Sequence, residues 1–313
     1  KYDFIIFKNN GIILNPVDDT MLLSYTLDAG NNRHNMDTLA KLHLGHKTIS
    51  YKDVVGTGKK QLNFSEVDLK LATEYAAEDA DVTLRLYNKL KVRLDEEKLN
   101  KNYEIFEKPM INLLSEIEFN GIKVDKDYLQ VLSKNFEKRI KKIEEEIYSL
   151  AGKKFNIGSP KQLGEIIYNE LKITKLKKTK KGSLATNANI LENLALAGHE
   201  FPNLVLEWRQ ISKLKNTYSD VLQDHISKKT KRVHTSFLLA ATNTGRLASS
   251  NPNLQNIPIK SEEGKEIRKA FVADKKNVLI SADYNQIEMR ILADMADVKE
   301  LKKAFKNNED IHS

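Results

Sequence analysis

The sequence of 313 residues contains no cysteine. This absence excludes a disulfide framework and any metal site built from thiolates, and it agrees with a reducing compartment without proving one. The chain also lacks an apolar run that approaches the length of a membrane span, and no segment resembles a signal peptide. No internal repeat is visible. These absences favour a cytoplasmic protein with no membrane partner.

Basic residues outnumber acidic ones, with 51 Lys and Arg against 43 Asp and Glu, which gives a formal net charge of +8. A basic surplus favours a polyanionic partner, although it is weak evidence alone. Six lysines and no acid lie in residues 172–181, and a second basic stretch covers residues 209–232. The lysine run is either a solvated loop or a phosphate-binding segment. The second interpretation is better only in an enzyme that acts on nucleic acid.

The most informative segment is residues 278–290, VLISADYNQIEMR. Its apolar, partly β-branched start predicts a buried strand that ends at Asp283, and a helical apolar pattern follows with Ile287 and Ile291. A carboxylate at the end of a buried strand is held rigidly enough to bind a divalent metal. The alternative is that Asp283 only caps the following helix.

Two further motifs flank this segment, TGRLASSNPNLQNIP at residues 244–258 and EDIHS at residues 309–313. In this order and spacing, the three motifs resemble family A DNA polymerases of the bacterial DNA polymerase I type. Residues 278–290 resemble the first catalytic motif of the palm. Asn285 and Met289 stand where the family usually has Ser and Leu, and Asp294 replaces a common His; the first two changes remove no metal ligand.

The resemblance implies a DNA-directed DNA polymerase that uses two Mg²⁺ ions per active site to attack the α-phosphate of an incoming deoxynucleoside triphosphate. Asp283 would be a catalytic ligand that bridges both metals, and the carbonyl oxygen of Tyr284 would add a further ligand. Tyr284, Gln286 and Glu288 would bind the substrate. Glu288 would lie beneath the sugar and exclude a 2′-hydroxyl; otherwise it is an ordinary surface glutamate.

The same resemblance implies contacts with primed double-stranded DNA. Arg246 would contact the minor groove at the primer end, where every correct pair offers an N3 or O2 acceptor. Asn253 and Gln255 would extend this test of pair geometry. The expected contacts to the primer backbone are Arg209, Lys213, Lys215 and Asn216, whereas Trp208 and Tyr218 are expected to pack the helix against its neighbours.

Residues 1–98 show a mostly helical pattern, and residues 75–83, YAAEDADVT, resemble the third motif of the linked 3′–5′ proofreading exonuclease. Such nucleases place four carboxylates and a tyrosine around two metal ions. Asp3 and Asp79 would be metal ligands, and Tyr75 would orient the attacking water. The alternative is that Tyr75 and Asp79, four residues apart, are an ordinary exposed helix pair.

Local signals predict where several helices begin. Asp18 or Asp19 can cap a helix in the first part of the chain, and Ser65 with Asp68 forms a capping-box pattern that opens a long helix. Further along the chain, Ser159 precedes a proline at the first helical position.

The predicted fold class is α+β and mostly helical. It comprises part of a ribonuclease H-like exonuclease domain (1–98) and part of a polymerase domain (99–313), with a thumb at about 120–231 and a palm portion at about 232–313. We expect an internal piece of a longer polypeptide, because the first exonuclease motif, the fingers helix and the second palm carboxylate are absent. The isolated piece should then be an inactive monomer that binds DNA. The alternatives are a stand-alone 3′–5′ exonuclease and a catalytically dead DNA-binding module.

Overall fold

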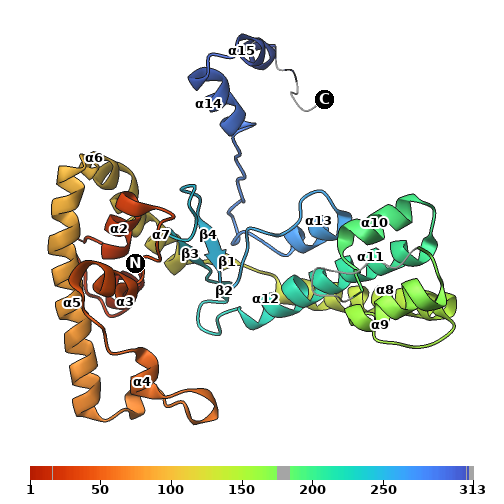
Figure 1. The fold of residues 1–313 in the computed structure, drawn as a ribbon, viewed down its shortest axis with the longest axis horizontal. Helices are drawn as coiled ribbons and strands as arrows, with labels where there is room; N and C mark the ends of the chain where they lie inside the picture. The colour runs from red at the N-terminus through yellow and green to blue at the C-terminus, as the bar shows by residue number, and fades with distance from the viewer. Residues whose placement is uncertain (16, 175–183, 308, 310–313) are drawn as a thin grey trace. The chain divides into compact units, whose positions relative to one another are not determined.

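The computed structural model describes residues 1–15, 17–174, 184–307 and 309 (Figure 1). Helices dominate, which confirms the predicted fold class. The chain forms two compact units, Lys1–Phe271 and Val272–Ser313. No helix of the described ranges is long and apolar enough to cross a membrane.

The first part of unit one is a helical layer around α5, the 28-residue helix Leu69–Glu96. The buried side chains of α5 are Val82, Leu86, Leu90 and Leu94, whose spacing places them on one face against α2. The other helices of this part are α1 (Tyr2–Asn9), α2 (Thr20–Asp28), α3 (Met36–Leu39), α4 (Tyr51–Val55), α6 (Asn100–Asn102) and α7 (Lys108–Asn120), with π-helical turns at Ala40–Leu44 and Tyr103–Glu107 and 3₁₀ turns at Gly58–Lys60 and Phe64–Glu66.

Side-chain caps determine where these helices begin. Asp19 accepts hydrogen bonds from the N–H groups of Met21 and Leu22, so it caps α2 as the sequence predicts. The predicted capping box of Ser65 and Asp68 is wrong. Asp68 is itself the N-cap residue of α5, and Ser65 belongs to the preceding 3₁₀ turn, which has its own capping box.

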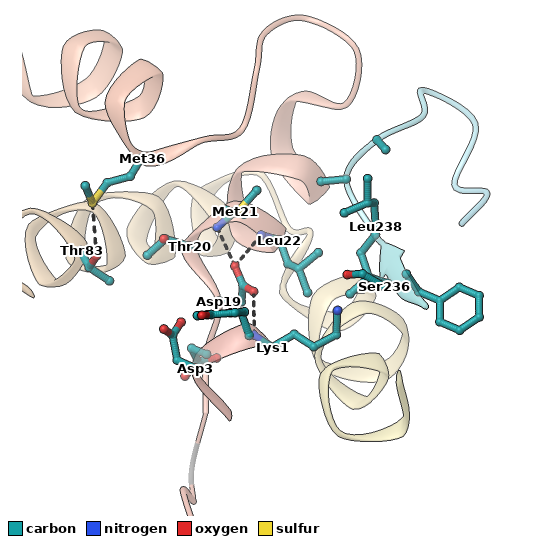
Figure 2. Close-up of a pocket in the computed structure, with 16 residues that line it drawn as sticks. Lys1, Asp3, Asp19, Thr20, Met21, Leu22, Met36, Thr83, Ser236 and Leu238 are labelled. Carbon is teal, nitrogen blue, oxygen red and sulfur yellow. Dashed lines mark hydrogen bonds and ion pairs between the residues drawn. The ribbon is translucent and has the colours of Figure 1, made fainter. Parts of the chain in front are cut away.

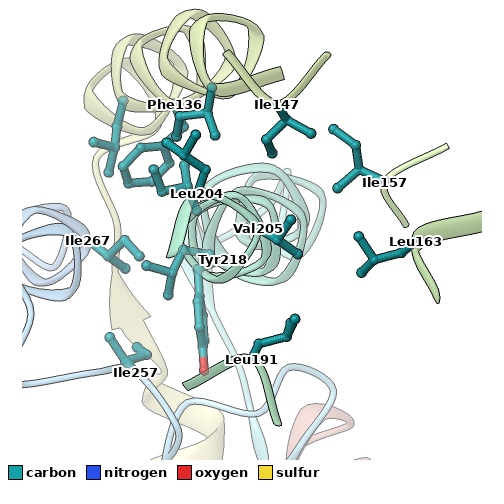
Figure 3. Close-up of a cluster of buried hydrophobic side chains, with 14 of the residues drawn as sticks. Phe136, Ile147, Ile157, Leu163, Leu191, Leu204, Val205, Tyr218, Ile257 and Ile267 are labelled. Atoms are coloured by element: carbon teal, nitrogen blue, oxygen red, sulfur yellow. The ribbon is translucent and has the colours of Figure 1, made fainter. Parts of the chain in front are cut away.

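The second part of unit one is a helical region with two short β-ribbons. Its core is built by α8 and α11, and Figure 3 shows Phe136, Val205 and Tyr218 among the side chains that meet there. Its elements are β1 (Ile122–Lys123), α8 (Lys126–Ala151), α9 (Pro160–Glu165), α10 (Ala188–Leu196), α11 (Glu200–Leu214), α12 (Val221–Asp224), β2 (Arg232–Val233), β3 (Ser236–Leu238), β4 (Ala248–Ser250) and α13 (Glu262–Lys269), with π-helical turns at Ile166–Glu170 and Lys215–Asp220.

The ribbons pair β1 with β2 and β3 with β4, both antiparallel. Gly121 precedes β1 with a φ of +60°, and a Cβ built there would lie 2.6 Å from the carbonyl oxygen of Val233. Only glycine fits this close approach without strain. The turn into β1 therefore fixes the register in which Ile122 faces Val233.

Unit two contains α14 (Ile287–Met295) and α15 (Lys299–Lys306). The predicted buried strand before Asp283 is wrong for this structure, because Val278 and Ile280 are 78% and 87% exposed and the segment is irregular. A strand needs a neighbour for its N–H and C=O groups, and no strand of the described residues pairs with this segment. The alternative role of Asp283 as a helix cap is also wrong, because the N-cap of α14 is Gln286.

Candidate active sites and nucleic-acid interface

Tyr75 and Asp79 lie one turn apart on α5, and both side chains are half-buried. Burial raises the pKa of the Asp79 carboxyl, and the hydrogen bond from Tyr75 only partly offsets this. One carboxylate oxygen of Asp79, Oδ1, is buried without a hydrogen-bond partner among the described residues. An orphaned buried carboxylate oxygen is costly unless a cation or water completes it, so this donor fits a metal ligand. The partial burial argues against an ordinary exposed helix pair.

The surroundings of Tyr75 and Asp79 hold this turn of α5 in place. The ring of Tyr75 packs edge-on against Tyr51 and Phe64, with centroid distances of 6.1 and 6.0 Å. Glu78, the residue between them on the helix, accepts a hydrogen bond from the backbone N–H of Ile49 at 2.6 Å.

The carboxylate of Glu78 has a second partner, Nε2 of His46, at 2.7 Å. Burial alone would raise the pKa of Glu78, but its hydrogen bonds lower it. No local sequence signal identifies this contact, because His46 lies 32 residues before Glu78 and reaches it only through folding.

Asp3 lies in the first turn of α1 and is exposed. It lines a cavity of about 530 Å³ together with Asp19, Met36 and Thr83 (Figure 2). Thr83 stands one turn after Asp79 on α5. In the described part of the chain, no group of three or more Asp, Glu or His side chains is arranged to hold a metal ion. The roles of Asp3 and Asp79 as metal ligands therefore stay predictions.

The residues of the palm motif lie in unit two, at the entry to α14. Asp283 and Glu288 are exposed, and the side chain of Tyr284 is 81% exposed. A carboxylate followed by an accessible backbone carbonyl is a donor set that Mg²⁺ accepts. Gln286 has a φ of +54°, which turns the chain into the helix.

The helix that follows this motif packs against α15. Nε of Arg290 donates to the carbonyl oxygen of Asn285 at 2.9 Å, and its guanidinium stacks over Phe305 at 4.5 Å. Asp294, which departs from the family pattern, forms an ion pair with Lys302 at 3.1 Å. These contacts join α14 to α15 beside the motif.

Arg246 is exposed in the loop between β3 and β4. The side chain of Gln255 accepts from the N–H of Ser249 at 2.9 Å and donates to the carbonyl oxygen of Leu247 at 3.0 Å. Asn253 in turn accepts from the N–H of Gln255. Both amide side chains therefore shape the chain on either side of β4, and their contacts with DNA stay predictions.

The predicted phosphate-binding residues of α11 and the turn after it differ in their surroundings. Arg209 is half-buried, its pKa is lowered by burial, and its Nη1 donates to the carbonyl oxygen of Thr186 at 2.6 Å. Lys215 forms an ion pair with Asp220 at 2.7 Å. Lys213 and Asn216 are exposed. Most of the lysine run, residues 175–181, lies outside the described residues.

The two aromatic residues of this region pack inward, as the sequence predicts. Tyr218 is buried and donates to the carbonyl oxygen of Asn256 at 2.5 Å. Trp208 is half-buried and donates from Nε1 to Glu144 at 2.9 Å. Their contribution is to the core of this region.

Comparisons with known proteins agree with this arrangement of motifs. The sequence model of DNA polymerase family A matches residues 126–313, which is more than half of the chain. The chain belongs to DNA polymerase family A. The first 95 residues of this family A chain match a 3′–5′ exonuclease family, and the two matches together confirm the predicted resemblance. The match over residues 126–313 contradicts the alternative of a stand-alone exonuclease.

Curated relatives cover the whole of this family A chain. It is 50% identical over 313 residues to DNA polymerase I of Rhizobium leguminosarum and 45% identical over 316 residues to DNA polymerase I of Pseudomonas aeruginosa. It covers 31% and 35% of these proteins, so it spans about a third of their length. A solved structure, the POL domain of Pol1 from M. smegmatis in complex with DNA primer-template and dNTP, matches with a TM-score of 0.82 and 33% identity over 98% of this chain and 50% of that one.

Proposed function

We propose that this family A chain serves template-directed DNA synthesis with linked 3′–5′ proofreading, in DNA replication and repair. The observation that carries the proposal is that one chain matches the exonuclease family over residues 1–95 and the polymerase family over residues 126–313, in that order. The activity is that of a DNA-directed DNA polymerase, which transfers a nucleotidyl group to the 3′-oxygen of a primer.

Two Mg²⁺ ions per active site, when bound, would supply the charge stabilisation and the activated oxygen nucleophile that phosphoryl transfer requires. On the polymerase side, the carboxylate of Asp283 and the carbonyl oxygen of Tyr284 would hold them. On the exonuclease side, Asp3 and Asp79 would do so, and this assignment is supported by the Asp79 oxygen that has no partner within the described part of the chain. Tyr75 orients the attacking water from the same face of α5.

The substrates are primed double-stranded DNA and deoxynucleoside triphosphates. The structural relative bound to primer-template and dNTP supports this choice. Arg246, with Asn253 and Gln255, tests the minor groove at the primer end. Gln286 helps to hold the nucleotide, and Glu288 excludes a 2′-hydroxyl. The chain acts as a monomer in the cytoplasm, and Arg209, Lys213, Lys215 and Asn216 contact the primer backbone.

Primer extension by the full-length gene product tests the polymerase assignment. Asp283→Asn should lower the extension rate by several orders of magnitude, because a neutral amide would hold a divalent cation far less well than a carboxylate, while duplex binding stays within about two-fold. Glu300→Gln is the matched control, because Glu300 is an exposed carboxylate of the same unit outside the motif. Near-normal extension by the Asp283→Asn variant would overturn the assignment.

A further inference from the structure

One residue of the exonuclease-like part holds the loop that carries Arg246. The ring of Tyr25, on α2, is 5% exposed. Its hydroxyl donates to the carbonyl oxygen of Thr242 at 2.8 Å and accepts from the N–H of Gly245 at 3.0 Å. One hydroxyl therefore joins both ends of a four-residue turn that lies more than 200 residues away in the sequence.

A hydrogen bond within the segment that contains the turn also stabilises it. Oγ1 of Thr242 donates to the carbonyl oxygen of Arg246 at 2.8 Å. Gly245 has a φ of +76° and nothing within 4 Å of a built Cβ, so packing does not restrict this residue. Hydrogen bonds therefore define the conformation of the turn, and Tyr25 supplies two of them.

The ring of Tyr25 is held in place by a buried neighbour, His34. His34 meets its ring edge-on at a centroid distance of 5.5 Å, and Nδ1 of His34 hydrogen-bonds Oγ of Ser24 at 2.9 Å. All three side chains are buried, and burial lowers the pKa of His34. These contacts fix the position of the Tyr25 ring and therefore that of its hydroxyl.

A second contact joins the same two segments. Gly30, just after α2, has a φ of +84°, and a Cβ built there would lie 2.8 Å from Cγ of Asn243. The side chain of Asn243, in the turn after β3, therefore packs directly on the chain after α2, and a Cβ at residue 30 would push this side chain aside.

We propose that Tyr25 is a positioning residue for the polymerase reaction, whose hydroxyl fixes the turn 242–245 and thereby the direction in which Arg246 reaches the primer terminus. The proposal rests on the proposed minor-groove role of Arg246. It makes a residue of the exonuclease-like part contribute to the fidelity of synthesis. Replacing Tyr25 with Phe removes the hydroxyl and keeps the buried ring, so the fold is preserved while the turn is released.

The test compares primers that end in guanine or in 3-deazaguanine, which lacks the N3 acceptor of the minor groove. Single-turnover extension is measured with the full-length gene product and its Tyr25→Phe, Arg246→Ala and doubly substituted variants. We expect the wild-type rate to fall with the analogue and the Arg246→Ala rate to be insensitive to it. We call the ratio of the rate with the guanine primer to the rate with the 3-deazaguanine primer the analogue penalty. The penalty should be about ten-fold smaller in Tyr25→Phe than in the wild type, and the double variant should behave as Arg246→Ala does.

Two further measurements separate positioning from general damage to the fold. Amide hydrogen exchange at Gly245 in the 313-residue chain should accelerate in Tyr25→Phe, because its N–H loses its acceptor. Tyr87→Phe, a change in a half-buried tyrosine packed against the core that includes Leu22 and Leu23 of α2, should alter neither the exchange rate nor the penalty.

The outcomes distinguish this inference from the proposed function. A full analogue penalty in Tyr25→Phe, with Arg246→Ala insensitive, would overturn the role of Tyr25 and leave that of Arg246 intact. An equal loss of rate on both primers, with the penalty unchanged, would also overturn it, because that is the signature of a structural defect. A wild-type rate that ignores the analogue would overturn the minor-groove role of Arg246 itself.

Discussion

Two lysines near the end of α11 should contribute unequally to DNA binding, although the sequence treats them alike. Lys213 is exposed, whereas Lys215 already forms an ion pair with Asp220. A lysine whose ammonium already contacts a carboxylate has part of its charge compensated, so it gains less from a phosphate. We therefore expect Lys213→Gln to weaken binding of primed duplex more than Lys215→Gln does.

The magnitudes follow from counterion release. If about four to six basic groups meet phosphates, the slope of log K against log salt is roughly −4 to −5. Removing Lys213 makes the slope less steep by about 0.9 and, at about 0.15 M salt, lowers the affinity about five-fold. The side chains of Lys215 and Asp220 are 19% and 37% exposed, so separating them costs at least as much as separating a solvated pair, about 0.2–1 kcal/mol, and the net gain from Lys215 is smaller by at least that amount. Asp220→Asn should consequently strengthen binding.

Fluorescence titrations of the 313-residue chain with a labelled primed duplex, at several salt concentrations, measure these slopes. Lys101→Gln is the matched control, because Lys101 is an exposed lysine of α6 far from α11 in sequence, and its slope should equal that of the wild type. Equal slopes for Lys213→Gln and the wild type would refute the phosphate contact. A larger loss in Lys215→Gln than in Lys213→Gln would refute the argument from the ion pair.

Three further predictions concern the candidate sites. Asp79→Asn should lower the trimming of a mismatched primer end by the full-length gene product by about 10²-fold or more, and Tyr75→Phe by about ten-fold, because a metal ligand is harder to replace than a water-orienting hydroxyl. Glu78→Gln should destabilise the fold by about 1–3 kcal/mol at pH 7, measured by urea unfolding. Because the folded-state pKa of Glu78 is lowered, this difference is present above its unfolded pKa and is lost as the pH falls through the folded pKa. Glu288→Ala should raise ribonucleotide incorporation relative to deoxynucleotide by about 10²-fold, measured by competition between the two triphosphates.

Each of these variants has a matched control or a decisive contrary outcome. Asp81→Asn changes an exposed carboxylate of the same helix and should leave trimming unchanged. Equal trimming by Asp79→Asn and the wild type would refute the proposed role of Asp79 as a metal ligand. Glu74→Gln, also exposed on α5, should show no pH-dependent loss, and a Glu78→Gln difference that grows on acidification would contradict a lowered folded-state pKa for Glu78. Unaltered sugar selection in Glu288→Ala would remove its role as a gate.

The sequence by itself determined two of the helix starts and the family. Asp19 and Ser159 cap helices as predicted, because a cap joins a side chain to N–H groups only two or three residues away and so needs no distant partner. The order of the polymerase and exonuclease motifs, which needs no folding to be seen, identified the family.

Tertiary structure decided which of the predicted residues are buried or hydrogen-bonded, and which residues they contact. The apolar run before Asp283 has strand composition, yet it forms no strand in this structure, because a strand is completed only by a partner elsewhere. The burial that leaves Oδ1 of Asp79 without a partner among the described residues depends on how α5 packs against other segments. The contact between Tyr25 and the turn of Arg246 joins residues about 220 positions apart, and only the folded chain brings such groups within hydrogen-bonding distance.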